Sequence, residues 1–314
     1  MGKGKNISVA VLMGGVSSER EVSLRSGQAV AEGLRQAGFT VFEAVANQND
    51  LSALEGLAID GVFIALHGGF GEDGRVQRLL EGAGIPYTGS GPAASLAAMD
   101  KGVSKQRFIA AAVPTAPYVV LESLPGPADC AAVFTRLGPR VVVKPIAQGS
   151  SIGVSIVERD GFESAVRAAI GFDGRAIVET FVKGRELTVG VLGDRALPIV
   201  ELRPRRSFYD YTAKYTKGQT EYIVNPDLPA GVASTVSRAG LAAFQCLGCR
   251  DFGRVDMMLS ERGDVFVLEV NTIPGFTETS LVPKAAKAAG VDFPALCATI
   301  VEMALERSTA ARPA

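Results

Sequence analysis

Two carboxylates in the segment 253–271, GRVDMMLSERGDVFVLEVN, have the spacing to do metal or phosphate chemistry. Two β-prone runs flank Arg262-Gly263, and this dipeptide predicts a two-residue hairpin turn. In the register that such a turn gives, Asp256 faces Glu269. Like charges directly opposite each other destabilise a sheet, so this pair suggests a bound cation.

The same register places Arg254 opposite Asn271, and side-chain alternation puts Asn271 on the face of Glu269. Two carboxylates and an amide suit a hard cation such as Mg²⁺ held together with nucleotide phosphates, and Arg254 beside them suits an oxyanion. The alternative is a solvated face on which Arg254 simply pairs with the acids. Val255, Met257, Leu268 and Val270 are expected to lie together on the other face of the hairpin.

A second candidate is the segment 144–155, KPIAQGSSIGVS, in which a lysine ends one β-run and a Gly/Ser loop leads into the next. It lacks the glycine-before-lysine order of a Walker A loop. A β–loop–β hairpin of this kind still offers backbone N–H groups and hydroxyls to phosphates, and the alternative is a flexible surface hairpin. Together with the acidic hairpin, this segment favours a Mg-nucleotide site.

Other local patterns are weaker. His67 ends the apolar run VFIALH, where a strand would bring it to a site, although a core or capping histidine is the alternative. The motif GFGEDG is disfavoured as a dinucleotide site because Glu72 and Asp73 would repel a pyrophosphate. Cys246 and Cys249 form a single CxxC, which lacks the two further ligands of a zinc site.

The elements that must position these residues begin with a βαβ pattern over 7–95. Strands are expected in ISVAVLMGG, TVFEAV, DGVFIALHGG and IPYTGS, with helices at 21–38 and 75–84. This pattern predicts an open α/β sheet whose sites lie at the carboxyl ends of the strands.

The rest of the chain mixes strands and helices. After a helical stretch at 93–112, strands are expected at 113–120, 140–146, 152–157, 175–182 and 186–192, with a helix at 161–170. The last unit contains the acidic hairpin and two late helices. The polar and aromatic segment 203–226 lacks a clear period and is expected to be a long loop, which in compact domains is often a functional lid.

Composition excludes several classes of protein. The 314 residues suffice for two or three domains, and 32 basic against 33 acidic side chains argue against a general nucleic-acid binder. No apolar run approaches the roughly 18 residues of a membrane span, and the start MGKGKNISVAV does not have the pattern of a signal peptide. We therefore expect a cytoplasmic protein without a membrane partner.

Several motifs occur together in an order that resembles one family: GGVSSEREVSLRSG, ALHGGFGEDG, PYTGSG, MDK, VVVKPIAQGSSIGVS, FYDYTAKY, GRVDMML and LEVNTIPGFTETSLVP. The family is that of the D-alanine–D-alanine ligases of the ATP-grasp superfamily, and the match runs from about Val9 to Glu306. It implies an ATP-grasp fold with an α/β domain at 1–100, a central subdomain at 101–185 and an α+β C-terminal subdomain at 186–314, with a lid at 203–226.

The resemblance also implies ligands and a role. These are ATP, Mg²⁺ or Mn²⁺, two molecules of D-alanine, a homodimer, and synthesis of a peptidoglycan precursor for the cell wall. It assigns Lys101, Lys144 and Ser151 to the phosphates, Glu179, Thr180, Phe181 and Val182 to the adenine, Glu186 to the ribose, and Asp256, Glu269 and Asn271 to the metal.

For the amino acids, the resemblance implies an acyl phosphate made from the first D-alanine and attacked by the amine of the second. Glu19 would hold the first ammonium, with His67 near the carboxyl group, and Arg254 and the Gly275 N–H would stabilise the oxyanion. Lys214, Ser280 and Leu281 match the second-substrate pocket. Ser150 and Tyr215 match a link from Glu19 to the lid.

Alternatives remain. A ligase of the same class could make D-Ala-D-lactate or D-Ala-D-Ser, although the family links a tyrosine at position 215 to the dipeptide product. A nucleotide-binding module without chemistry is a second class, disfavoured because the acids and Arg254 are present. A dehydrogenase that binds NAD is weaker still.

Overall fold

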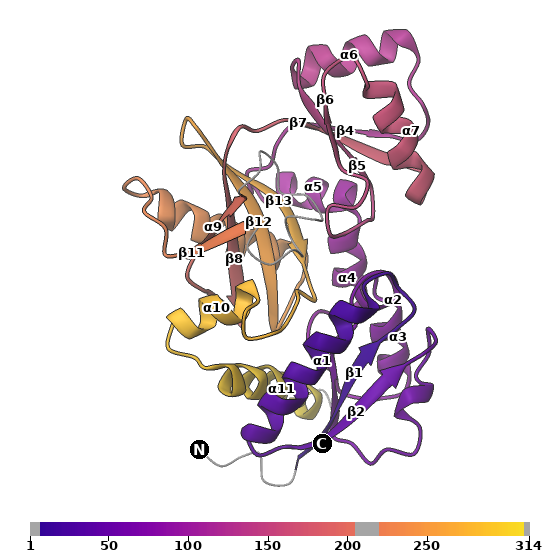
Figure 1. The fold of residues 1–314 in the computed structure, drawn as a ribbon, viewed down its shortest axis with the longest axis vertical. Coiled ribbons are helices and arrows are strands. Elements are labelled where there is room, and N and C mark those ends of the chain that lie inside the picture. The colour runs from indigo at the N-terminus through magenta and orange to yellow at the C-terminus, as the bar shows by residue number, and fades with distance from the viewer. Residues whose placement is uncertain (1–6, 205–219, 311–314) are drawn as a thin grey trace.

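The computed structural model describes residues 7–204 and 220–310, and these residues form three sheets, each with its own helices (Figure 1). The N-terminal unit lies at the bottom of Figure 1 in indigo, the central unit at the top in magenta, and the C-terminal unit at the left in orange and yellow. The candidate site residues come from all three units.

A three-stranded parallel sheet in the order β2-β1-β3 forms the N-terminal unit, as the βαβ pattern predicts. Its strands are β1 (Ser8–Gly14), β2 (Thr40–Ala46) and β3 (Gly61–Ile64). Its helices are α1 (Arg20–Gln36), η1 (Ser52–Leu54), α2 (Gly69–Glu72), α3 (Arg75–Gly82) and α4 (Pro92–Met99). The central strand β1 is buried on both faces, as its continuous apolar run requires.

The segment IPYTGS is not a strand, contrary to the prediction. Only Tyr87 pairs with the sheet, in a single parallel bridge to Val62. Gly89, at φ +90°, then turns the backbone, and its N–H donates to Asp251 of the C-terminal unit at 2.8 Å. The chain therefore leaves the sheet and continues into α4.

Four antiparallel strands in the order β4-β7-β5-β6 form the central sheet. The elements of this unit are α5 (Lys101–Ala110), β4 (Tyr118–Leu121), α6 (Pro127–Leu137), β5 (Val141–Pro145), β6 (Ser155–Val157), α7 (Phe162–Asp173) and β7 (Ala176–Thr180). Helix α6 was not predicted. It starts with a proline in its first turn, which is favourable there, and it buries Val133, Phe134 and Leu137.

The C-terminal sheet has the order β11-β10-β8-β12-β13, and β9 pairs with β8 at its side. The elements are β8 (Gly184–Leu192), β9 (Arg195–Ala196), β10 (Val200–Pro204), β11 (Thr220–Val224), α9 (Val232–Cys246), β12 (Phe252–Ser260), β13 (Val265–Asn271), α10 (Leu281–Ala288) and α11 (Phe293–Ala310). Helix α9, also not predicted, packs on β8, β12 and β13 through Val236, Ala243 and Phe244.

The expectation of a strandless loop over 203–226 is wrong at both ends. Strand β10 extends to Pro204, β11 begins at Thr220, and the two strands pair in antiparallel register. The sequence TEYIV of β11 is rich in β-branched and aromatic residues, which favour a strand. Residues 205–219, with Lys214 and Tyr215, lie outside the described residues, so the lid stays a prediction.

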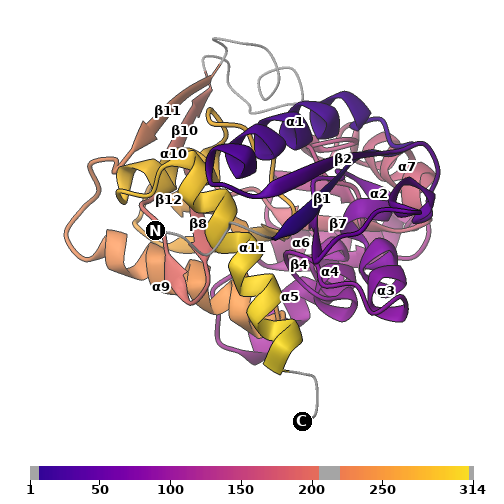
Figure 2. The same cartoon turned by 90° about the horizontal axis from the view of Figure 1, so that it is seen from below.

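The two ends of the chain share one core. Helix α11 packs against α1 of the N-terminal unit (Figures 1 and 2), and a single cluster combines Val9, Val11 and Leu34 with Leu296 and Ile300. The C-terminal helices therefore attach the N-terminal unit to the rest of the molecule. The predicted boundaries at 100 and 185 remain a proposal.

Membrane-spanning potential is confined to one pair of helices. No single helix in the described ranges is long and apolar enough to cross a membrane. The pair α10 and α11 passes by length and composition together, but it is bent by 104°. Leu296, Ile300 and Val301 of α11 are buried in the core shared with α1.

Candidate active site

The acidic hairpin of β12 and β13 has the predicted pairing at its functional end. Asp256 pairs with Glu269, and Arg254 pairs with Asn271. Strand β8 lies on the other side of β12 and places Thr188 next to Asp256. Three neighbouring strands therefore position the two carboxylates.

The connection is not the predicted two-residue turn. The Ser260 N–H donates to the Asp264 carbonyl at 2.8 Å, so the loop consists of three residues, 261–263, and Gly263 adopts φ +91°. This changes the register by one residue, and a bulge on β13 next to the acidic pair restores it. The two deviations cancel, which is why the predicted pairing is correct although the predicted turn is wrong.

Leu268 is the bulged residue, and its predicted place on the same face as Met257 and Val270 is wrong. Met257 pairs with Val267 instead, and both side chains are completely buried. Leu268 lines a cavity together with Met258. The bulge therefore moves one apolar side chain from the core to the site.

Two cavities meet in front of this hairpin. The larger, of about 930 Å³, lies between the central and C-terminal sheets, and the smaller, of about 790 Å³, reaches the N-terminal unit. Both cavities are lined by Lys101, Gln148, Arg254, Glu269 and Leu281, which form the shared wall. Two bound molecules could react with each other at this wall.

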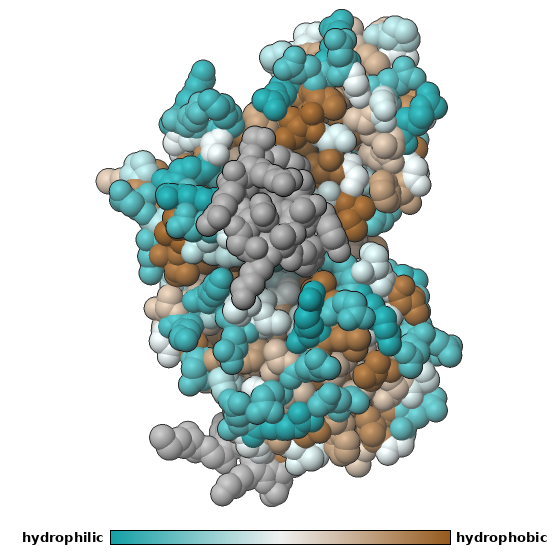
Figure 3. Space-filling view, in the orientation of Figure 1, coloured by the Kyte–Doolittle hydropathy of each residue, from teal (hydrophilic) through white to brown (hydrophobic). Residues whose placement is uncertain are grey.

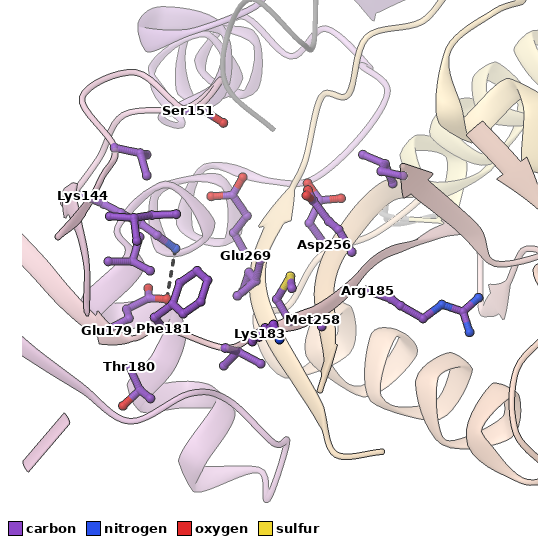
Figure 4. Close-up of a pocket in the computed structure, with 18 of the residues that line it drawn as sticks. Lys144, Ser151, Glu179, Thr180, Phe181, Lys183, Arg185, Asp256, Met258 and Glu269 are labelled. Carbon is purple, nitrogen blue, oxygen red and sulfur yellow. Dashed lines mark hydrogen bonds and ion pairs between the residues drawn. The ribbon is translucent and has the colours of Figure 1, made fainter. Parts of the chain in front are cut away.

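The predicted site residues divide between the two cavities. The larger is also lined by Lys144, Ser151, Glu179, Thr180, Phe181, Val182, Glu186 and Asp256 (Figure 4). The smaller is also lined by Glu19, His67, Ser150, Asn271, Gly275 and Ser280. Every predicted site residue that the structure describes therefore lies in one cavity or in the shared wall.

Each of the two opposed acids has a basic partner. Arg254 donates twice to Asp256, from Nε to Oδ1 at 2.8 Å and from Nη2 to Oδ2 at 2.7 Å. The Thr188 hydroxyl donates to Asp256 Oδ1 at 2.7 Å, and Lys101 Nζ lies 3.6 Å from Glu269 Oε2. The ion pairing considered as the alternative is thus present, but on a cavity wall, where Arg254 is only 6% exposed.

A buried group of charges surrounds Glu179 at the end of β7. Its Oε2 lies 3.0 Å from Lys144 Nζ (Figure 4), and its Oε1 lies 3.5 Å from Lys105 Nζ. Burial opposes the charge of Glu179, but Lys105 and Lys144 outweigh it and lower the pKa of this carboxyl. Burial also opposes the charge of Lys144, but Glu179 and Glu269 raise its pKa. Both groups therefore stay charged inside the larger cavity.

The wall beside Glu179 has the character of a site for a flat ring. Apolar side chains line it, among them Val142, Ile156, Phe181, Met258 and Leu268. In Figure 3, hydrophobic residues gather on the central unit above the grey segment. Figure 4 shows the Thr180 hydroxyl pointing away from Lys144, as alternation along β7 requires.

The Gly/Ser loop between β5 and β6 crosses from the central unit to the N-terminal unit. Its start is held by Asp173, which accepts from the Ala147 N–H at 3.0 Å and from Gln148 Nε2 at 2.7 Å. At its tip, Ser150 adopts φ +54°, and the Ser150 hydroxyl donates to Glu19 Oε1 at 2.5 Å. The loop therefore contributes part of the lining of the smaller cavity.

His67 is a buried residue at the carboxyl end of β3. Its Nε2 lies 3.0 Å from the Ser26 hydroxyl, and its Nδ1 lies 3.0 Å from the Ile273 carbonyl. Glu72 Oε1 lies 3.6 Å from Nδ1. These contacts fix the ring in the wall of the smaller cavity.

The segment after β13 completes the smaller cavity. Gly275 lies in its wall, and Ser280 is the residue immediately before α10. The Ser280 hydroxyl accepts the Thr277 N–H at 3.0 Å and lies 3.0 Å from the Thr277 hydroxyl. This segment therefore adds polar groups to the lining of the smaller cavity.

Comparison with known proteins identifies the family. Two family models match, one described as the D-ala D-ala ligase C-terminus over residues 108–302 and one as the N-terminus over residues 42–90. A D-alanine–D-alanine ligase from Desulforudis audaxviator is 48% identical over 305 residues, which cover 95% of this chain and 99% of the relative. The chain belongs to the D-alanine–D-alanine ligase family.

Solved structures of this family share the fold. The D-alanine–D-alanine ligase from Bacillus anthracis complexed with ATP superposes with a TM-score of 0.84 at 33% identity, covering 97% of this chain and 99% of that one. The VanG D-Ala:D-Ser ligase from Enterococcus faecalis gives a TM-score of 0.83 at 27% identity, with 95% and 99% covered. The predicted family and the predicted ATP-grasp fold are confirmed.

Several residues of this D-alanine–D-alanine ligase site were not predicted. Lys105 contacts Glu179, and its spacing of four residues from Lys101 on α5 was a usable signal. Gln148 in the shared wall stands inside the quoted Gly/Ser motif, and its carbonyl accepts from Lys101 Nζ at 2.6 Å. Thr188 and Asp173 had no signal in the sequence, because their partners are 68 and 25 residues away.

Proposed function

We propose that this chain is an ATP-dependent ligase that joins two molecules of D-alanine to D-alanyl-D-alanine. One observation carries the proposal: two cavities of suitable size meet at a wall that carries Lys101, Arg254 and Glu269. A ligase must bring a phosphate donor and an amino acid together at such a wall. Family membership supplies the identity of the two substrates.

ATP would occupy the larger cavity. Glu179, Thr180, Phe181 and Val182 line this cavity and are assigned to the adenine, and Glu186 is assigned to the ribose. Lys101, Lys144 and Ser151 would bind the phosphates, because two lysines and a hydroxyl offer the positive charge and the donors that phosphates need. The ATP complex of the Bacillus anthracis relative supports this choice of nucleotide.

Asp256, Glu269 and Asn271 would hold Mg²⁺ or Mn²⁺. Their oxygens are the ligands that hard divalent cations prefer, so the donor set fits. In the described part of the chain, no three His, Cys, Asp or Glu side chains cluster closely enough to hold a metal on their own. Phosphate oxygens of the nucleotide would complete the coordination, and the bound cation would neutralise phosphate charge.

The first D-alanine would lie in the smaller cavity. Glu19 is assigned to its ammonium, and His67, fixed by Ser26 and Ile273, would lie near its carboxyl group. The carboxylate would attack the γ-phosphate at the shared wall, which gives an acyl phosphate and ADP. Closure by the Ser150–Glu19 contact would help to keep water away from this intermediate.

The second D-alanine would then attack the acyl phosphate with its neutral amine. The bond from carbon to the phosphate oxygen breaks as the peptide bond forms, and phosphate leaves. Arg254 and the Gly275 N–H would stabilise the oxyanion of the tetrahedral intermediate, a role that suits preorganised donors. Ser280, Leu281 and, outside the described residues, Lys214 are assigned to the second substrate, and Tyr215 to the link with Ser150.

The fold alone does not decide the second substrate, since the VanG D-Ala:D-Ser ligase shares it. We favour D-alanine because the 48% identical relative is a D-alanine–D-alanine ligase. Synthesis of a peptidoglycan precursor in the cytoplasm, where ATP is supplied, and assembly as a homodimer belong to the same proposal.

Phosphate release tests the proposal. The purified chain with ATP and Mg²⁺ should release phosphate only when D-alanine is added, with one dipeptide formed per phosphate. Lys144→Met should bind ATP more weakly, because a buried ammonium of the phosphate site is lost. ATP binding without any release in the presence of D-alanine would instead support a nucleotide-binding module.

A further inference from the structure

Lys284 lies in the smaller cavity and has no role in the reaction described above. It is the fourth residue of α10, and its N–H donates to the Ser280 carbonyl at 3.0 Å. Its ammonium lies 4.5 Å from the centre of the Tyr222 ring on β11, the strand adjacent to α10 (Figure 1). Stacking on an aromatic face holds this half-buried ammonium in place.

The Lys284 ammonium has no acidic partner among the described residues. Burial lowers its pKa, and no carboxylate of the described residues opposes this shift. By contrast, Lys101, Lys105 and Lys144 each lie within ion-pair distance of a glutamate. A bound anion would stabilise this partly desolvated cation.

The position of Lys284 indicates which anionic group it would bind. It lines the smaller cavity but does not belong to the shared wall, so it is not placed for the nucleotide phosphates. The carboxylate of the first amino acid reacts, and it must therefore reach the shared wall. The carboxylate of the second amino acid does not react, and it needs a cation elsewhere in the same cavity.

Few basic groups of the described residues compete for this role. Apart from the shared wall, the basic residues of the described chain that line the smaller cavity are Arg25, His67 and Lys284. Arg25 is exposed, and both ring nitrogens of His67 already have polar partners. Lys284 is the half-buried cation that remains, and it lies one helical turn from Ser280.

We propose that Lys284 binds the carboxylate of the second, acceptor amino acid and thereby selects acceptors that carry a free carboxylate. This inference rests on the proposed function and names a further group that recognises the acceptor. With its carboxylate at Lys284 and Ser280, the acceptor would direct its amine toward the shared wall, where the acyl phosphate forms.

Competition between two acceptors tests this role without interference from the other sites. D-Alaninamide carries the same amine and side chain as D-alanine but no carboxylate, and it cannot act as the first substrate. In a mixture of both with ATP and Mg²⁺, the ratio of D-Ala-D-Ala to D-Ala-D-alaninamide measures relative kcat/KM for the acceptor. This ratio does not depend on the fraction of active enzyme or on ATP affinity.

Lys284→Met should lower the product ratio by at least about tenfold, since a charge-assisted contact to the carboxylate is lost. Lys284→Arg should keep the ratio close to that of the wild type. Lys287→Met is the matched control, because Lys287 lies on the same helix but is exposed, and it should leave the ratio unchanged.

An unchanged ratio of the two products in Lys284→Met would overturn the inference. It would also be overturned if Lys284→Met and Lys284→Arg both fold but neither forms any product. Thermal unfolding and ATP binding identify the folded variants. If the wild type forms neither product, the proposed function fails instead, which keeps the two failures distinct.

Discussion

Arg254 and Asp256 stand two residues apart on β12 and form a buried bidentate ion pair, with donor–acceptor distances of 2.8 and 2.7 Å. Arg254 lines both cavities, whereas Asp256 lines only the larger one. The pair therefore connects the proposed metal and nucleotide site with the place where the oxyanion would form. It also reduces the repulsion between Asp256 and Glu269, because the Arg254 charge offsets that of Asp256.

Replacement of Arg254 should affect the transition state more than the binding of ATP. Arg254→Met should lower kcat for ligation by about 100-fold or more, the scale for loss of one oxyanion donor, with a much smaller rise in KM for ATP. Steady-state kinetics with saturating D-alanine separate the two constants. If only the KM for ATP rises, Arg254 is a nucleotide clamp and its oxyanion role is wrong.

Glu269→Gln should weaken metal binding while the fold persists. One anionic ligand is lost to a hard cation, so turnover at limiting Mg²⁺ should fall by at least about tenfold, and excess Mg²⁺ should restore part of it. The matched control is Glu261→Gln, which changes an exposed glutamate in the turn of the same hairpin. Near-normal turnover of a folded Glu269→Gln variant at limiting Mg²⁺ argues against the metal assignment.

Lys105 should contribute to stability through its buried contact with Glu179. Lys105→Met removes a fully buried partner and leaves the carboxylate with less compensation, so the free energy of unfolding should fall by on the order of 3 kcal/mol. Lys183→Met is the control, because Lys183 and Glu261 are 75% and 62% exposed and the change should stay below about 0.5 kcal/mol. Urea denaturation measures both, and equal stabilities of the two variants would contradict this account of the buried charges.

The site was largely predictable because its segments carry strong local signals. Buried apolar runs predict β1, β5, β7 and β8, and Lys144 and the glycines of the Gly/Ser loop lie at or just beyond a strand end, whereas Asp256 lies in the middle of β12. The pairing of Asp256 with Glu269 was correct for an incomplete reason. The three-residue loop and the bulge at Leu268 depend on how β12 pairs with its neighbouring strands. The sequence of the hairpin alone does not contain that information.

The missed elements have different causes. Helices α6 and α9 are amphipathic to the same degree as α7, which was predicted, so their helical period was a signal in the sequence that was not used. The segment IPYTGS has strand-like residues, but the contact between Gly89 and Asp251, which are 162 residues apart, accompanies its turn away from the sheet. Contacts over such distances in sequence leave no local pattern.

Product identity tests the central claim most directly. The purified chain is supplied with ATP, Mg²⁺ and equal concentrations of D-alanine, D-serine and D-lactate near pH 7, and the products are quantified by mass spectrometry. Amines react faster than hydroxyls once deprotonated, and the family links a tyrosine at position 215 to the dipeptide. We therefore expect D-Ala-D-Ala to predominate and Tyr215→Phe to weaken that preference, because a phenyl ring cannot donate to Ser150. A mixture dominated by D-Ala-D-lactate or D-Ala-D-Ser, or one without any ligation product, would contradict the assignment of this chain as a D-alanine–D-alanine ligase.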